Sequence, residues 1–209
     1  MKFSTYTLLS QLILGYVWLV FGGILWIEAT SNVNIEKFAI VGAPIAIVLG
    51  YFINTFSSWI ENGLFWLWRG KPSRRLIEGT ANGKIIFYSH KELRKLIQQD
   101  LGKYYSDQPT SDPKELDELF GHTLSFVSSG PNRYEEFNAS YAFSRGLIVT
   151  LIGGWIAFLI GQTLDVCPIG AWYHLFWILI LVAFFRTKER AYYLAREAIA
   201  NYYRIKSGG

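Results

Sequence analysis

The sequence has few charged residues for its length. Asp, Glu, Lys and Arg make up 17% of its 209 residues, whereas 51% are hydrophobic and 17% aromatic. Soluble domains usually carry about 25% charged residues. Residues 146–164 contain no charged residue and no proline. Lipid must cover so large an apolar excess, which excludes an ordinary soluble domain. The net charge of +4 would suggest nucleic-acid binding in a soluble protein, but in a membrane protein the positive-inside rule is the simpler reason for it.

Cysteine and histidine are also scarce. Cys167 is the only cysteine, so an intramolecular disulfide is excluded. None of the histidines, His90, His122 and His174, has a second His or a Cys at metal-ligand spacing, so no metal site is predicted. There is no GxSxG nucleophile motif and no Walker-type phosphate loop. We therefore expect neither an enzyme nor a resident cofactor.

Two long stretches organise the chain. Residues 132–164 begin polar and turn apolar at Arg145, which predicts one continuous helix about 50 Å long at 1.5 Å per residue. Residues 171–206 mirror this pattern, apolar through Phe185 and then charged. We expect each helix to cross a bilayer and to continue into the cytoplasm.

Four spans are predicted, over residues 6–27, 38–56, 146–164 and 171–185. The first apolar run is too long for the core of a signal peptide and lacks a small-residue cleavage site, so we expect it to remain as a membrane helix. The fold class is an all-α membrane protein with a mostly helical cytoplasmic insert and helical extensions of spans three and four. Its segments are membrane helices in 1–56, an interfacial segment in 57–75, the insert in 76–131, and the last two spans with their extensions in 132–209.

Residues 57–68 combine aromatic residues with an apolar helical stripe, which is typical of an amphipathic helix lying along the inner leaflet. Span two could equally continue into this segment. A basic cluster follows it and is expected to contact anionic headgroups. The predicted membrane-interface residues are Trp59, Trp66, Trp68, Arg69, Lys71, Arg74 and Arg75.

The distribution of charge predicts the orientation. With four spans both termini share one side, and that side carries 19 of the 20 basic residues and 13 of the 16 acidic residues. Lys37 is the one basic residue near the outer side. The positive-inside rule therefore predicts a multi-pass protein of the bacterial inner membrane with both termini in the cytoplasm.

The insert, residues 76–131, has ordinary soluble character. A strand is expected at 84–88, followed by a helix over 90–105 that Ser89 caps. A second helix is expected to begin near Pro113 and to end near Gly121, with a second strand at 123–129. The insert is too small to fold comfortably alone, so it should pack against the helical extensions.

The spans lack Asp, Glu, Lys and Arg at mid-depth, which disfavours an ion-coupled transporter. A pore closed by apolar side chains remains compatible with the sequence. Close helix packing, within one subunit or between subunits, is predicted at Gly22, Gly23, Gly153, Gly154 and Gly161.

Basic residues alternate with tyrosines on the predicted cytoplasmic helices, a combination that suits an anionic, base-bearing ligand. The candidate ligand-binding residues are Lys91, Arg94, Lys95, Arg133, Arg145, Arg186, Arg190 and Arg196. Alternatively, Arg145 and Arg196 pair with nearby acids and the tyrosines form the core of a helical stalk. The acids available for this pairing are Glu135, Glu136, Glu189 and Glu197.

In layout alone the chain resembles the small multi-span effectors of bacterial antiviral defence systems. This resemblance implies a homo-oligomeric inner-membrane effector or ion channel, gated from the cytoplasm by a nucleotide-like anion, an oligonucleotide or a protein partner. Duplex DNA is not expected as a ligand. The alternative hypothesis is a non-conducting membrane anchor or sensor that recruits a cytoplasmic partner through residues 76–131.

Overall fold

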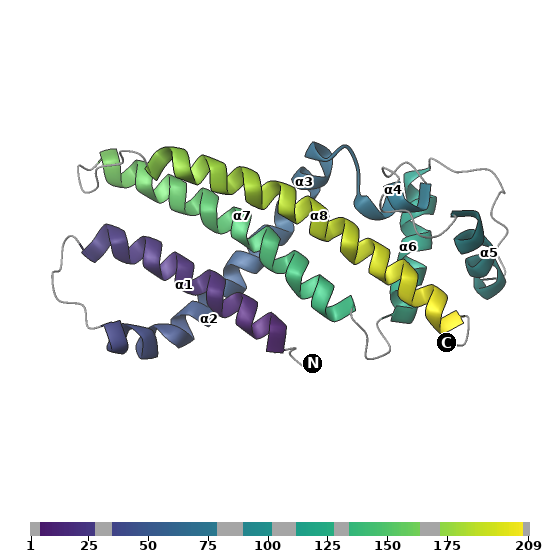
Figure 1. Ribbon diagram of the computed structural model, residues 1–209, viewed down its shortest axis with the longest axis horizontal. Coiled ribbons are helices and arrows are strands. Elements are labelled where there is room, and N and C mark those ends of the chain that lie inside the picture. Colours follow the sequence, from purple (N-terminus) through teal and green to yellow (C-terminus); the bar gives the residue numbers. More distant parts are fainter. Residues whose placement is uncertain are drawn as a thin grey trace. The chain divides into compact units, whose positions relative to one another are not determined.

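The described part of the protein is entirely helical. The computed structural model describes residues 5–27, 35–78, 90–101, 112–127, 134–163 and 172–206, which form eight helices and no strand (Figure 1). The helices are α1 (Thr5–Ile27), α2 (Ile35–Trp59), α3 (Glu61–Leu67), α4 (Pro72–Glu78), α5 (His90–Leu101), α6 (Pro113–Val127), α7 (Tyr134–Thr163) and α8 (Trp172–Lys206). The all-α prediction is confirmed for these residues, as is the continuity of the two long helices.

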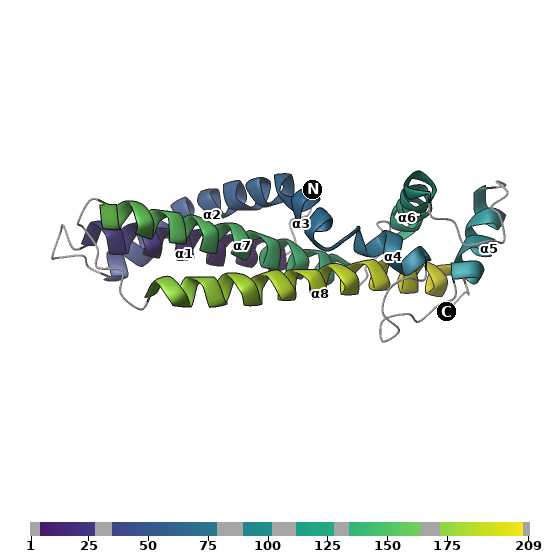
Figure 2. The same ribbon diagram turned by 90° about the horizontal axis from the view of Figure 1, so that it is seen from above.

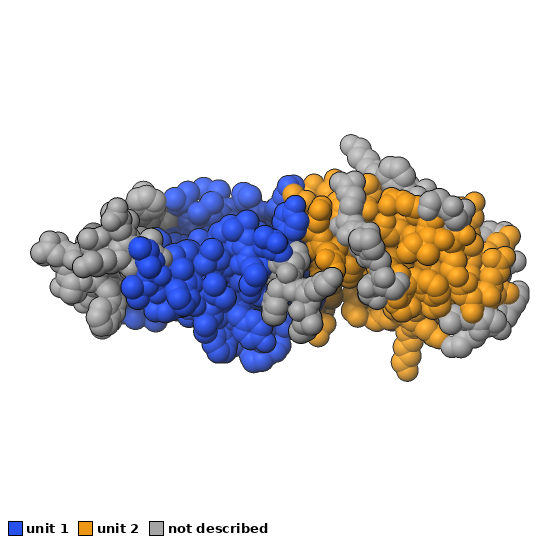
Figure 3. Space-filling view, turned by 90° about the horizontal axis from the view of Figure 1, so that it is seen from below, with its two compact units in different colours: residues 1–61, 139–187 blue, residues 62–138, 188–209 orange. Residues whose placement is uncertain are grey.

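The chain divides into two compact units (Figure 3). Unit 1 consists of Met1–Glu61 and Ala139–Thr187, and unit 2 of Asn62–Asn138 and Lys188–Gly209. Because α7 and α8 run past these boundaries, each of the two helices contributes to both units.

Two helical stretches are long and apolar enough to cross a membrane, Ile40–Trp59 and Tyr134–Thr163. A shorter apolar helix, Leu8–Phe21, lies in α1. The chain is thus a helical protein with two candidate membrane-spanning helices among its described residues. The prediction of four spans goes beyond this finding.

Helices α1 and α2 of unit 1 cross so closely that only glycine fits at two contact points. A Cβ atom on Gly15 would lie 1.7 Å from the carbonyl oxygen of Ala46, and one on Gly50 would lie 1.9 Å from that of Gln11. Backbone atoms cannot move aside as a flexible side chain can, so these two glycines set the distance between the helices.

Helix α7 packs against α1 through a second set of glycines. Gly146 lies against the side chain of Leu14, Gly153 against Trp18, and Gly154 against Phe21. Helix α8 joins the unit through ring contacts, with the Trp155 and Trp177 centroids 5.1 Å apart. Figures 1 and 2 both show the apolar half of α8 running alongside α7.

The outer faces of unit 1 remain strongly apolar. On α2, large hydrophobic side chains are exposed at Ile40, Val41, Ile45, Val48, Tyr51, Phe52, Phe56 and Trp59. On α8 they are exposed at Trp177, Ile178, Leu181, Val182 and Phe185. Contiguous apolar surface of this kind is what a membrane helix presents to lipid or to another membrane helix.

Unit 2 is built around a hydrophobic core that α8 shares with the insert helices. The core side chains come from α4, α5, α6 and α8 and include Leu76, Ile77, Leu93, Ile97, Leu116, Leu119, Val127, Tyr192, Ile199 and Tyr202. Packing of the insert helices against the extension of span four is therefore seen within this unit.

The second predicted strand is wrong, because α6 continues past Gly121 to Val127. Its buried residues, Leu116, Leu119, Thr123 and Val127, recur at helical spacing. The Thr123 hydroxyl donates a hydrogen bond to the carbonyl oxygen of Phe120 at 2.7 Å. An exposed glycine inside a helix costs only about 1 kcal/mol, which the buried stripe outweighs. The strand predicted at 84–88 lies outside the described residues.

Helix α6 is capped at its start. The Asp112 carboxylate accepts a hydrogen bond from the backbone N–H of Lys114 at 3.0 Å, and Pro113 occupies the first helical position. The other predicted insert helix begins at His90, as expected, and α5 is described as far as Leu101.

Residues 57–68 do not form one continuous helix. Helix α2 runs on through Trp59, and a separate short helix, α3, then begins at Glu61. Helix α4, which was not predicted, follows inside the basic cluster and begins with Pro72. Residues 57–68 are therefore the end of α2 followed by the short helix α3.

Candidate functional site

Arg145, on α7 of unit 1, is held by a network of partners within its own unit. Its Nη1 atom lies 2.6 Å from Oε2 of Glu61, and its Nε atom donates to Oγ of Ser57 at 3.1 Å. The Tyr141 hydroxyl donates to the other oxygen of Glu61 at 2.7 Å. Arg145 also lies over the Tyr141 ring, 5.3 Å from its centroid.

The network neutralises a buried charge. Arg145 is only 9% exposed, and an isolated buried guanidinium would be strongly disfavoured. Glu61 supplies the opposite charge, whereas the sequence had suggested Glu135 and Glu136, which are exposed. Arg145 is therefore occupied within the chain, which weakens its assignment as a ligand-binding residue.

A second site lies in unit 2, where α3 ends and α4 begins. The Gly70 amide donates to the carbonyl of Phe65 at 2.9 Å, and the Arg69 amide donates to that of Trp66 at 3.0 Å. This pair of hydrogen bonds is a Schellman motif. It places Arg69 at a left-handed position, with φ of 61°, where glycine is usual and an L side chain costs about 1–2 kcal/mol.

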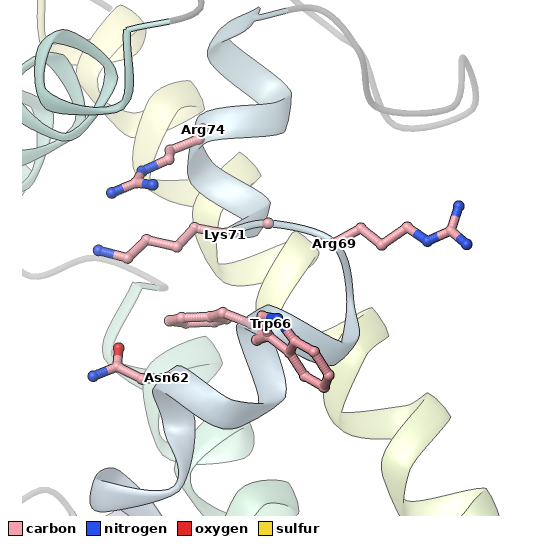
Figure 4. A pocket seen from close by; sticks show the side chains of 7 residues that line it. Asn62, Trp66, Arg69, Lys71 and Arg74 are labelled. Carbon is pink, nitrogen blue, oxygen red and sulfur yellow. The ribbon is translucent and has the colours of Figure 1, made fainter.

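The turn forms one wall of a pocket of about 510 Å³. Its lining residues are Asn62, Phe65, Trp66, Arg69, Gly70, Lys71 and Arg74. In Figure 4, the side chains of Lys71 and Arg74 extend toward the same side as Asn62, and that of Arg69 extends the opposite way. The pocket thus combines three cations with two aromatic rings, and we call it the basic pocket.

Asp117 of α6 joins two of these cations. The Arg74 guanidinium donates from Nε to Oδ1 at 2.7 Å and from Nη2 to Oδ2 at 2.6 Å. Lys71 Nζ donates to Oδ2 at 3.0 Å. The hydrogen bond from Arg74 is the largest cause of the lowered pKa of Asp117, and the same hydrogen bond raises the pKa of Arg74. All three side chains remain about one third exposed, so solvent reaches them.

The predicted interface residues divide by exposure. Trp59 is 68% exposed on unit 1, and Trp66 is 79% exposed on unit 2. Trp68 is only 2% exposed, so it packs inside its unit and does not offer a surface to lipid. Arg69 is exposed, whereas Arg75 is half-buried beside Gly70.

The candidate anion-binding residues are distributed over both units. Arg145 and Arg186 belong to unit 1, and Lys95, Arg190 and Arg196 belong to unit 2. Arg196 lies over the Tyr193 ring, 5.5 Å from its centroid. Arg133 and the side chains of Lys91 and Arg94 lie outside the described residues. Within the described part of either unit, the structure does not gather these residues into one pocket.

The predicted packing glycines Gly153 and Gly154 serve contacts inside the subunit. Gly153 and Gly154 accept side chains of α1, as described above, and Gly161 is buried on α7. Gly22 and Gly23 fall in a part of α1 whose side-chain environment lies outside the described residues. For Gly153 and Gly154 the structure favours packing within one chain.

Sequence reasoning missed a third polar cluster, around Asp100 at the end of α5. The Tyr202 hydroxyl donates to Asp100 Oδ2 at 2.5 Å, Lys206 donates to Oδ1, and His122 Nε2 lies 3.5 Å from Oδ2. Burial acts to raise the pKa of Asp100, but the hydrogen bonds from Lys206 and Tyr202, together with the nearby His122, outweigh it and lower the pKa below its ordinary value of 3.8. Burial, together with the hydrogen bond to Asp100, raises the pKa of Tyr202.

This cluster predicts a pH-dependent contribution to the stability of unit 2. Because the pKa of Asp100 is lower in the folded chain, its stabilising effect is complete above about pH 4 and is lost as pH falls through the folded-state pKa. Asp100→Asn should therefore destabilise the protein near neutral pH, and the difference from wild type should shrink in acid. Chemical denaturation of both forms across this pH range measures it. An unchanged difference at every pH would show that the Asp100 charge contributes nothing.

Comparison with family models, with curated proteins and with solved structures returned no match to this chain. Its functional assignment therefore depends on the geometry described above.

Proposed function

We propose that this chain is a four-span protein of the bacterial inner membrane, with both termini in the cytoplasm, that acts as a non-conducting anchor and sensor. Unit 1 is the membrane part, and unit 2 receives a cytoplasmic partner or an anionic ligand. The candidate spans in α2 and α7 and the exposed apolar faces of α2 and α8 support the membrane placement.

One observation favours an anchor over a conducting pore. The buried charge of unit 1, Arg145, is neutralised by Glu61 within the same chain. An ion pathway usually depends on ionisable groups that face water, and this pair is satisfied internally. Gly153 and Gly154 are likewise used within the subunit, which removes one support for an oligomeric pore.

A homo-oligomeric effector or channel, gated by a nucleotide-like anion as in antiviral defence, is the second candidate. Its support is the extent of apolar surface on α2 and α8, which a second copy could cover as well as lipid. Helix α8 also runs without interruption from Trp172 to Lys206, so a displacement of its polar half would be transmitted to its apolar half.

Ion flux separates the two candidates. We expect proteoliposomes containing the full chain to release no more trapped ion than protein-free vesicles, both with and without soluble cytoplasmic extract. A known channel reconstituted in parallel provides the positive control. Conductance that depends on extract, together with an oligomer in detergent, would reject the anchor and favour the effector.

A further inference from the structure

Among the described residues, the basic pocket holds more positive charge than its contacts neutralise. Arg69, Lys71 and Arg74 line it, and Asp117 is the carboxylate that contacts two of them. In the part of the chain that the structure describes, the Arg69 side chain makes no hydrogen bond or ion pair. The pocket therefore has a paired Lys and Arg on one side and an exposed Arg69 side chain that extends the opposite way.

The backbone at Arg69 adds a second observation. A left-handed conformation at a non-glycine residue stores strain, and such residues concentrate at binding sites. Glycine would relieve this strain and still complete the Schellman turn. An arginine at this position is explained if its side chain contributes to binding, because the fold alone would favour glycine.

Asp117 occupies the place that an external anion would take. A fork of two parallel hydrogen bonds from one guanidinium, supplemented by a lysine ammonium, is the geometry with which proteins bind phosphate as well as carboxylate. The side chains of Asp117, Lys71 and Arg74 are about one third exposed, and exposed ion pairs contribute little to stability. A phosphate group with more negative charge can therefore displace the carboxylate.

We propose that the basic pocket binds a phosphate-bearing anion through Lys71 and Arg74, that the exposed Arg69 side chain turns from the opposite side to join them, and that Asp117 is the internal competitor that holds Lys71 and Arg74 while the pocket is empty. The phosphate belongs either to a lipid headgroup or to a soluble molecule. The exposed ring of Trp66 at the pocket wall suits the boundary between headgroups and acyl chains. The lipid source, unlike the soluble one, rests on the membrane placement proposed above.

Calorimetric titration of the full chain in neutral detergent tests the site. The probes are inorganic phosphate and short-chain phosphatidic acid, with short-chain phosphatidylcholine as the neutral-headgroup control. We expect Lys71→Gln and Arg74→Gln each to weaken binding about tenfold, because each removes a charge-assisted contact. Asp117→Asn should tighten it severalfold, because the competing charge is removed. Lys114→Gln is the matched control. It also removes one positive charge, from a lysine three residues before Asp117 that does not line the pocket, and should change affinity less than twofold.

Two variants of Arg69 distinguish a role in binding from a role in the structure of the turn. Arg69→Gly should raise the melting temperature by a few degrees, because it relieves the left-handed strain, yet should weaken phosphate binding severalfold. Arg69→Gln, which removes no contact within the described chain, should weaken binding without changing stability. Unchanged affinity in both variants would overturn the role of Arg69.

Three results would overturn the rest of the proposal. These are a lack of binding of both probes, an equal loss of affinity in Lys114→Gln and Lys71→Gln, and weaker binding in Asp117→Asn.

Cosedimentation with vesicles that contain phosphatidic acid distinguishes a lipid source of the phosphate from a soluble one. Binding to these vesicles that Arg74→Gln reduces supports the lipid source. Binding of inorganic phosphate without this lipid dependence supports the site and assigns the phosphate to a soluble molecule.

Discussion

Glu61→Leu is expected to lower the free energy of unfolding by about 3–5 kcal/mol, because it leaves the buried charge of Arg145 without its partner. The Tyr141 hydroxyl loses its acceptor in the same substitution. Ser57 remains as a neutral partner for Arg145 and cannot balance a full charge. Reversible unfolding of the purified chain in mixed detergent micelles, followed by circular dichroism, measures the change.

The double variant Glu61→Leu with Arg145→Met distinguishes a lost ion pair from lost packing. Replacement of both charges by apolar side chains of similar size is often neutral, so most of the stability should return. If Glu61→Leu alone lowers the free energy of unfolding by less than about 1 kcal/mol, Arg145 is instead solvated, like a member of an exposed ion pair. Arg145 would then again be available to an external anion.

Gly15→Ala and Gly50→Ala are expected to destabilise unit 1 by about 3 kcal/mol or more each, at the upper end of the cost of overpacking. The new methyl groups would lie 1.7 Å and 1.9 Å from carbonyl oxygens of the facing helix, so α1 and α2 must separate. Separation also weakens the contacts that Leu14 and Trp18 make with α7. The same unfolding measurement in micelles applies.

Gly121→Ala is the matched control for these substitutions. Gly121 lies inside α6, is exposed, and has no atom near the position of the added methyl group. The substitution should stabilise the protein by about 0.5–1 kcal/mol, because alanine loses less backbone entropy in a helix. If Gly15→Ala had the same mild effect, the close crossing of α1 and α2 would be contradicted.

The long helices could be predicted from sequence because their signals are local. The uninterrupted stretch after Arg145 predicted α7, and the apolar run ending at Phe185 with charged residues behind it predicted α8. Pro113 likewise marked the start of α6. Gly121 misled the prediction of its end, because one exposed glycine was given more weight than the buried stripe that continues to Val127.

The sites could not be predicted because their residues meet only in three dimensions. Glu61 was expected on an interfacial helix, and nothing in its neighbourhood in the sequence connects it with Arg145. Asp117 pairs with Arg74, 43 residues earlier in the chain, which no local pattern in the sequence reveals. The basic cluster itself was visible in the sequence. Its organisation by a left-handed Arg69 depends on where α3 ends, which composition does not specify.

The most direct test of the proposed function is the membrane topology of the full chain. Reporter domains can be placed after Gly209, near Pro109 in the insert, and near Asn34 between the first two predicted spans. We expect cytoplasmic signals at Gly209 and Pro109 and a signal from the opposite side at Asn34. A periplasmic signal at Pro109 would contradict it, because the insert would then lie on the wrong side of the membrane for a cytoplasmic partner.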